Sequence, residues 1–301
     1  MRYLALALVL AAPPMTPASA GQAVTEKMTC PIGGAEFNFE TTASHSSWGT
    51  RPDGKPYGSW TFPPALPECP DNGLVLYKDY DAAEVAKLEP LVASEAYQAL
   101  RRTDTQYYRA YWLMQQMGVE PERSLLALIR AAWEADAKPE LRARYLTEFA
   151  EATARLEPKP ADINWIGMEA TAVDALRETG RFDEALARLD RMPDVSAPPA
   201  APTGEDRNPA AEQARERRNW AEYLAKVRKA IERKDASAEP LDMIPRRIAL
   251  TRCLDEAGKL DEHGRAFCAS EEKAVAAFRA SRDKALQEMN ALSKPREESG
   301  R

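Results

Sequence analysis

Side chains suited to acid–base or metal chemistry are scarce, since the 301-residue chain contains only two histidines, His45 and His263. Neither stands in a His-Glu-x-x-His motif, and no Gly-x-Ser-x-Gly motif occurs. Gly33-Gly34 lacks the lysine and helix of a phosphate-binding loop. The 47 acidic residues are so scattered that no pair stands out as general acid and base. The sequence therefore predicts no catalytic residue, no cofactor and no enzymatic activity.

Long hydrophobic runs are also missing, and the longest is residues 4–12 near the N-terminus. This run is about half the length that a bilayer span needs. Arg2 precedes it, and Ala18-Ser19-Ala20 follows it as a small-x-small cleavage pattern. We therefore expect residues 1–20 to be a cleavable signal peptide, with an uncleaved anchor as the alternative. The mature protein is expected in the periplasm or secreted, without a membrane span.

An excess of basic residues is absent as well. The whole chain has 41 basic and 47 acidic residues, and removal of residues 1–20, which include Arg2, leaves 40 basic (41 − 1) against 47 acidic. Proteins that bind nucleic acids through the phosphate backbone need a positive surface. The charge balance therefore predicts no nucleic-acid partner.

The four cysteines form two groups that are far apart in the sequence, Cys30 with Cys69 and Cys253 with Cys268. Cysteines of exported proteins are usually oxidised to disulfides. Four cysteines allow three connectivities, and the pairing within each group is favoured because each group brackets one compact segment. A redox-active Cys253 and Cys268 pair is the alternative, although redox motifs usually place their thiols two residues apart.

The hydrophobic pattern divides the remaining chain into a β-rich head and a set of helices. In the head, residues 21–79, short strands are expected around Phe37 and Phe39 and around Trp60 and Phe62, with a third at residues 74–77. After residue 79, apolar residues recur at the spacing of amphipathic helices. We expect a helical array over 80–192, a proline-rich loop or linker over 193–209, C-terminal helices over 210–292 and a disordered tail over 293–301. Within the last group, single helices are predicted at about 210–234, 241–257 and 266–292.

The segment Gly180-Arg181-Phe182-Asp183-Glu184-Ala185-Leu186 resembles the turn and second helix of a tetratricopeptide repeat. The first helix of this unit departs from the repeat, because Glu169 replaces the usual tryptophan and Val173 the usual glycine. With this resemblance, the predicted fold class is mainly α: antiparallel helical hairpins in a tetratricopeptide-like array, with a small β-rich, disulfide-bonded N-terminal head.

Two turns of the head, Cys30-Pro31-Ile32-Gly33-Gly34 and Cys69-Pro70-Asp71-Asn72-Gly73, resemble the knuckles of a zinc ribbon. Over roughly residues 27–190, the chain resembles an uncharacterised bacterial family that joins a zinc-ribbon-like head to tetratricopeptide-like helices. The second cysteine of each knuckle is replaced, by Gly33 and by Asn72. We therefore expect a Cys30–Cys69 disulfide and no metal, and the alternative is a metal site completed by His45 and Asp71.

A loop-rich stretch of the head carries aromatic and charged residues that could form a ligand surface, or could instead fill the core of a small domain. These residues are His45, Trp48, Arg51, Asp53, Tyr57 and Trp60. The favoured function is an exported, non-enzymatic binding or scaffold protein with a protein partner. One alternative is a periplasmic metal-binding or thiol-redox protein that uses Cys30, Cys69 and His45. Another is a hydrolase of envelope polymers that acts through unidentified carboxylates.

Overall fold

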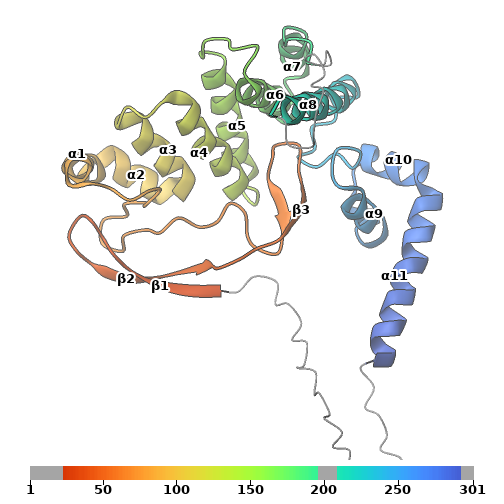
Figure 1. Ribbon diagram of the computed structural model, residues 1–301, viewed down its shortest axis with the longest axis horizontal. Coiled ribbons are helices and arrows are strands. Elements are labelled where there is room, and N and C mark those ends of the chain that lie inside the picture. Colours follow the sequence, from red (N-terminus) through yellow and green to blue (C-terminus); the bar gives the residue numbers. More distant parts are fainter. Residues whose placement is uncertain (1–22, 196–208, 293–301) are drawn as a thin grey trace, which may run out of the picture.

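The computed structural model describes residues 23–195 and 209–292, and it is mainly helical with a small β head (Figure 1). This confirms the predicted mainly α fold class. The predicted signal peptide at 1–20, the tail at 293–301 and most of the predicted linker lie outside the described residues. Among the helices that are described, none is long and apolar enough to cross a membrane.

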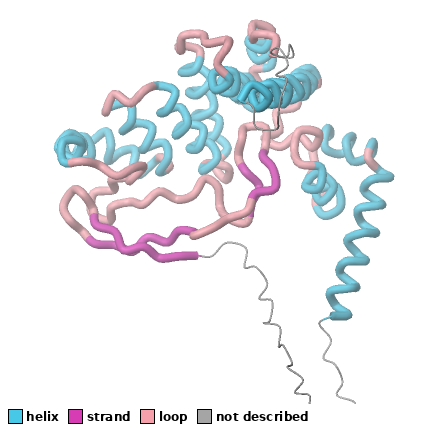
Figure 2. The backbone as a smooth tube through the Cα atoms, in the orientation of Figure 1, coloured by secondary structure: helices cyan, strands magenta, loops and turns pink. Residues whose placement is uncertain are grey.

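The head consists of two antiparallel strand pairs joined by residues 43–46, and a long irregular segment, residues 59–81, leads from them to the helices (Figure 2). Strand β1 (Ala23–Thr29) pairs with β2 (Glu36–Thr42), and Met28 lies opposite Phe37. Strand β3 (Ser47–Thr50) pairs with β4 (Pro56–Gly58), with an irregular register. The head lies along one side of the helices rather than forming a separate globule (Figure 1).

A disulfide between Cys30 and Cys69 joins the two knuckle-like turns, as the sequence predicts. Both turns have the same backbone pattern: the cysteine N–H donates to the carbonyl five residues ahead, and its own carbonyl accepts from the glycine four residues ahead. Asn72, which replaces a cysteine, donates its side-chain amide to the carbonyl of Ile32 in the other turn, at 3.1 Å. The two turns are thus held together by one covalent bond and one hydrogen bond.

Seven helices follow the head and pack against their sequence neighbours. They are α1 (Ala82–Ala93), α2 (Glu95–Thr103), α3 (Gln106–Gln116), α4 (Pro121–Glu134), α5 (Pro139–Thr153), α6 (Ile163–Glu178) and α7 (Phe182–Leu189). Asp81 and Glu84 form a capping box at α1, and Pro121 and Pro139 start α4 and α5. The main core lies between α3, α4, α5, α6 and α8.

The turn between α6 and α7 shows how local sequence sets a helix boundary. Gly180 has a φ of 74°, and the N–H of Arg181 returns to the carbonyl of Leu176, which is the Schellman pattern. Across this hairpin Arg188 donates two hydrogen bonds to Glu169, at 2.7 and 2.8 Å, with both side chains nearly buried. A nearly buried charged pair therefore joins the two helices of this hairpin.

The C-terminal part begins with the long helix α8 (Pro209–Glu232), which packs on α6 and α7. It continues with α9 (Arg246–Asp255), a short 3₁₀ turn (Ala257–Lys259), α10 (Glu262–Ser270) and α11 (Glu272–Leu292). A Cys253–Cys268 disulfide links α9 to α10, as predicted, so all four cysteines are paired.

Four expected elements differ from the structure, and one of them is the helix expected over about 241–257, which begins only at Arg246, after Pro245. No strand forms around Trp60 and Phe62, because the prolines that follow leave too few backbone donors for a ladder. Residues 74–77 contribute only one isolated bridge, between Val75 and Glu68. The helix expected over 266–292 starts earlier, at Glu262, and is interrupted at Glu271.

Candidate ligand-binding groove

An open groove with a volume of about 690 Å³ lies between α4, α6 and α8, with α5 at its floor. Its apolar lining comes from four helices: Leu126, Ile129, Trp133, Phe149, Met168 and Trp220. Leu126 of α4 has 50% of its surface exposed, and it is informative because it belongs to a continuous apolar lining. The groove therefore presents apolar surface that the fold itself leaves uncovered.

Two tryptophans define the groove, and neighbouring backbone fixes each of them. The ring of Trp220 lies against Gly167 so closely that a Cβ there would come within 2.8 Å of it. The indole N–H of Trp133 donates to the carbonyl of Asp53 in the head, at 3.2 Å. The head thus supplies one end of a groove that is otherwise made of helices.

The rim of the groove is charged unevenly. Arg123 and Arg130 are exposed on α4, and neither forms an ion pair with any residue that the structure describes. Glu122, beside them, is already paired with Lys159 at 2.7 Å. Two guanidinium groups on the α4 side are therefore available to carboxylates of a ligand.

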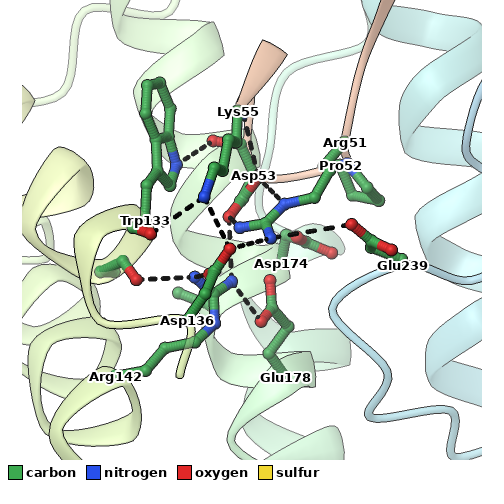
Figure 3. Close-up of polar contacts among 12 residues, drawn as sticks. Arg51, Pro52, Asp53, Lys55, Trp133, Asp136, Arg142, Asp174, Glu178 and Glu239 are labelled. Carbon is green, nitrogen blue, oxygen red and sulfur yellow. Dashed lines mark hydrogen bonds and ion pairs between the residues drawn. The ribbon is translucent and has the colours of Figure 1, made fainter. Parts of the chain in front are cut away.

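Behind Trp133, residues 51–55 of the head insert into a network of buried charges (Figure 3). Arg51 donates to Asp53 at 3.1 Å and to Asp136 at 2.7 Å, and its side chain is 6% exposed. Lys55 donates to the same Asp136 oxygen at 2.7 Å and to the carbonyl of Trp133 at 3.0 Å. The head is thus joined to the end of α4 by charge-assisted hydrogen bonds.

Arg142 of α5 joins this network from the helical side. It donates to Asp53 at 2.9 Å, to Asp136 at 3.0 Å and to Glu178 at 2.7 Å (Figure 3). Burial acts to raise the pKa of Asp53, but the hydrogen bonds and charges of Arg51 and Arg142 outweigh burial and hold this pKa below its usual value. Asp53 is therefore ionised and fully engaged within the protein.

A second buried pair connects the array to the C-terminal part. Arg177 and Asp174 of α6 are completely buried and form a 2.7 Å ion pair. Arg177 also donates to the carbonyls of Asp235 and Ser237, at 2.6 and 2.7 Å. The hydroxyl of Tyr223 on α8 donates to the carbonyl of Pro52, at 3.0 Å. Head, array and C-terminal part therefore meet at one polar junction.

Glu178 gives this junction a predicted dependence on pH. Burial raises its pKa to about 8, and the Asp174 and Asp53 carboxylates reinforce the shift against the charge of Arg142. The folded protein then keeps a proton that the unfolded chain, with a glutamate pKa of about 4.3, has lost. The free energy of unfolding should therefore fall as pH rises from about 5 to about 8, by at most about 1.4 kcal/mol per pH unit.

Urea denaturation at several pH values measures this effect. Glu178→Gln should reduce the decrease of the free energy of unfolding between about pH 5 and about pH 8. Glu151→Gln, on the exposed face of α5, should leave this decrease unchanged. If Glu178→Gln and the parent chain have parallel profiles, Glu178 does not carry the proton.

The structure separates the residues of the predicted ligand surface. Arg51 and Asp53 are buried in the charge network. Tyr57 packs with the small core of the C-terminal part, and Trp60 is half-buried. Trp48 and His45 are exposed, with the His45 ring against the edge of Phe62. Of the six residues, only Asp53 also lines the groove.

Residues 49–55 contain a phosphate-loop spacing that sequence reasoning missed, Gly49 followed by Gly54-Lys55. Pro56 stands where such a loop has serine or threonine, and a strand rather than a helix follows. The Lys55 ammonium is bound by Asp136 and the carbonyl of Trp133. The spacing therefore serves the junction between head and array.

The residues that line the groove also escaped prediction, although one of them gave a signal. Leu126 lies one position off the buried stripe of Leu125, Leu128 and Ile129, so a helical wheel places it outside the core.

Within the described ranges, no cluster of histidine, cysteine, aspartate or glutamate has the arrangement of a metal site. Comparison with protein-family models, curated proteins and solved structures gave no match, so the function is inferred from this geometry alone.

Proposed function

We propose that this chain is an exported, non-enzymatic binding protein that holds an apolar segment of a protein partner in the groove between α4, α6 and α8. The observation that carries the proposal is the exposed apolar lining, which includes Leu126, Trp133 and Trp220. Sites for apolar ligands are concave and mostly apolar, with a few polar groups that fix orientation. Arg123 and Arg130 supply those polar groups here.

The arrangement of carboxylates supports binding rather than catalysis. The side chains of Asp174 and Glu178 lie behind the groove, at 0% and 3% exposure, and neither lines it. Asp53, which does line the groove, is engaged by Arg51 and Arg142. These buried ion pairs therefore hold the helices that form the groove in place. A wall that is rigid before binding lowers the entropic cost of holding a ligand.

Export is supported by both disulfides, which persist in oxidising compartments outside the cytoplasm. The expected signal peptide belongs to this part of the proposal. Edman sequencing of the protein recovered from the periplasm of an expressing bacterium should begin at Gly21.

Peptides selected on the purified protein from a random phage-displayed library test the groove. Replacing Leu126 with aspartate should weaken the selected peptides at least about tenfold, because a charge would replace about 1.5–3 kcal/mol of apolar burial. Ala225→Asp, on the exposed face of α8, is the matched control and should leave the affinity unchanged. Isothermal titration calorimetry measures both variants. Peptides that bind all three proteins equally would place the ligand elsewhere and contradict the proposal.

A further inference from the structure

The last turns of α11 lie at the surface of the described part of the chain. Every side chain from Asp283 to Asn290 is exposed, and the helix projects away from the other elements (Figure 1). Leu286 and Met289, with 46% and 60% of their surface exposed, lie three residues apart and therefore on one face. This end of α11 presents an apolar ridge to solvent.

The first half of α11 is fixed to the C-terminal part, which sets the direction in which its exposed end projects. Val275 packs on the core of the C-terminal part, and Arg282 binds Asp255 of α9 through two contacts of 2.7 and 2.8 Å. Short helical segments without tertiary contacts are marginally stable in water. A surface that covers Leu286 and Met289 would therefore stabilise these turns.

The groove and the end of α11 carry three of the four large hydrophobic side chains that are exposed in the described part of the chain. The large hydrophobic side chains that are exposed there are Trp48, Leu126, Leu286 and Met289. Residues 283–290 and residues 123–130 are each eight residues of helix, which span about 12 Å at 1.5 Å per residue. The two surfaces therefore agree in length as well as in apolar character.

The carboxylate of Asp283 at this end of α11 has the opposite charge to two rim residues of the groove, Arg123 and Arg130, while Glu216 also lines the groove. Asp283 precedes Leu286 by three residues and so flanks the ridge on the same side of the helix. Arg123 and Arg130 flank the groove without a carboxylate partner among the described residues. Within one chain, α11 points away from α4, with α9 and α10 between them (Figure 1). The groove of a second copy is the surface that this ridge fits.

We propose that the end of α11 docks in the groove of a second copy, and that the exchange is reciprocal and forms a two-fold dimer. A reciprocal contact closes on itself and forms no fibre. The inference rests on the proposed function, because the same groove holds both ligands. A protein partner must then displace α11, so dimerisation competes with binding of the partner.

Two singly substituted proteins test the contact. A chain with Leu126→Cys is mixed with a differently tagged chain with Met289→Cys and treated with a short bismaleimide. A crosslink between residues 126 and 289 of different molecules is expected. Lys284→Cys is the control, since Lys284 lies two residues from Leu286 on the opposite face of α11. Links only between two copies of residue 289 would mean that the α11 ends pair with each other, which would overturn the inference.

Light scattering after size exclusion gives the second readout. The double variant Leu286→Asp, Met289→Asp should raise the dimer dissociation constant at least about tenfold, and Leu126→Asp should do the same. Circular dichroism checks that helicity is retained. A parent chain that is monomeric and forms no crosslink between residues 126 and 289 overturns the inference. If that monomer still binds the selected peptides through Leu126, the proposed function stands without it.

Discussion

Replacing Arg177 with methionine is expected to lower the free energy of unfolding by about 3–5 kcal/mol, the usual cost of removing one partner of a buried ion pair. Arg177 is fully buried and bridges Asp174 to the carbonyls of Asp235 and Ser237. Methionine keeps much of the apolar volume but leaves the Asp174 carboxylate without its partner. Burial already raises the pKa of Asp174, so this carboxyl would take up a proton in the variant.

Arg228→Met is the matched control, because Arg228 forms a single exposed pair with Asp190. Exposed pairs contribute at most about 1 kcal/mol. Chemical denaturation of both variants at neutral pH measures the difference. Equal losses in the two variants would show that the buried pair between α6 and the C-terminal part does not hold the junction together.

Removing the Cys30–Cys69 disulfide by a double serine substitution should cost about 4 kcal/mol, from the chain entropy released in a loop of about 40 residues. The same change at Cys253 and Cys268, which are 15 residues apart, should cost about 3 kcal/mol. We expect loss of the first disulfide to expose the head to proteolysis while the helices persist. Limited proteolysis followed by mass spectrometry locates the first cuts.

The outcome that contradicts this prediction is a first cut within the helical array, or an unchanged unfolding midpoint. Either result would mean that residues 51–55, rather than the disulfide, keep the head in place. Arg51→Met, combined with the serine substitutions, then measures how much each connection contributes, because the two act on the same segment.

Local signals in the sequence were sufficient for much of the fold. The left-handed Gly180 and the prolines at 121 and 139 mark helix ends through the backbone conformations they favour, and the structure places helix boundaries there. Both disulfides join the cysteines that are nearest in sequence, because each pair brackets one short unit. These features depend on contacts over a few tens of residues at most.

The groove and the charge network depend on contacts over much longer separations. Arg51 and Asp136 are 85 residues apart, and Tyr223 reaches Pro52 across 171 residues. Nothing in the composition around Arg51 distinguishes a buried charge from a solvated one. The sequence pattern predicted Arg51 and Asp53 as residues of a ligand surface, but both side chains are buried in the charge network. Among the residues of the groove, only Leu126 gave a local signal in the sequence, because it is an apolar residue that lies off the buried stripe of its helix.

The Cys30–Cys69 bond also determines how mechanical force passes through the molecule. If the N-terminus is pulled, tension enters at Cys30 and crosses the disulfide directly to Cys69. Residues 31–68, which include the segment inserted behind Trp133, then carry load only through the pairing of β2 with β1. A protein held under strain by its N-terminus would therefore keep the groove wall undistorted for as long as that bond remains oxidised.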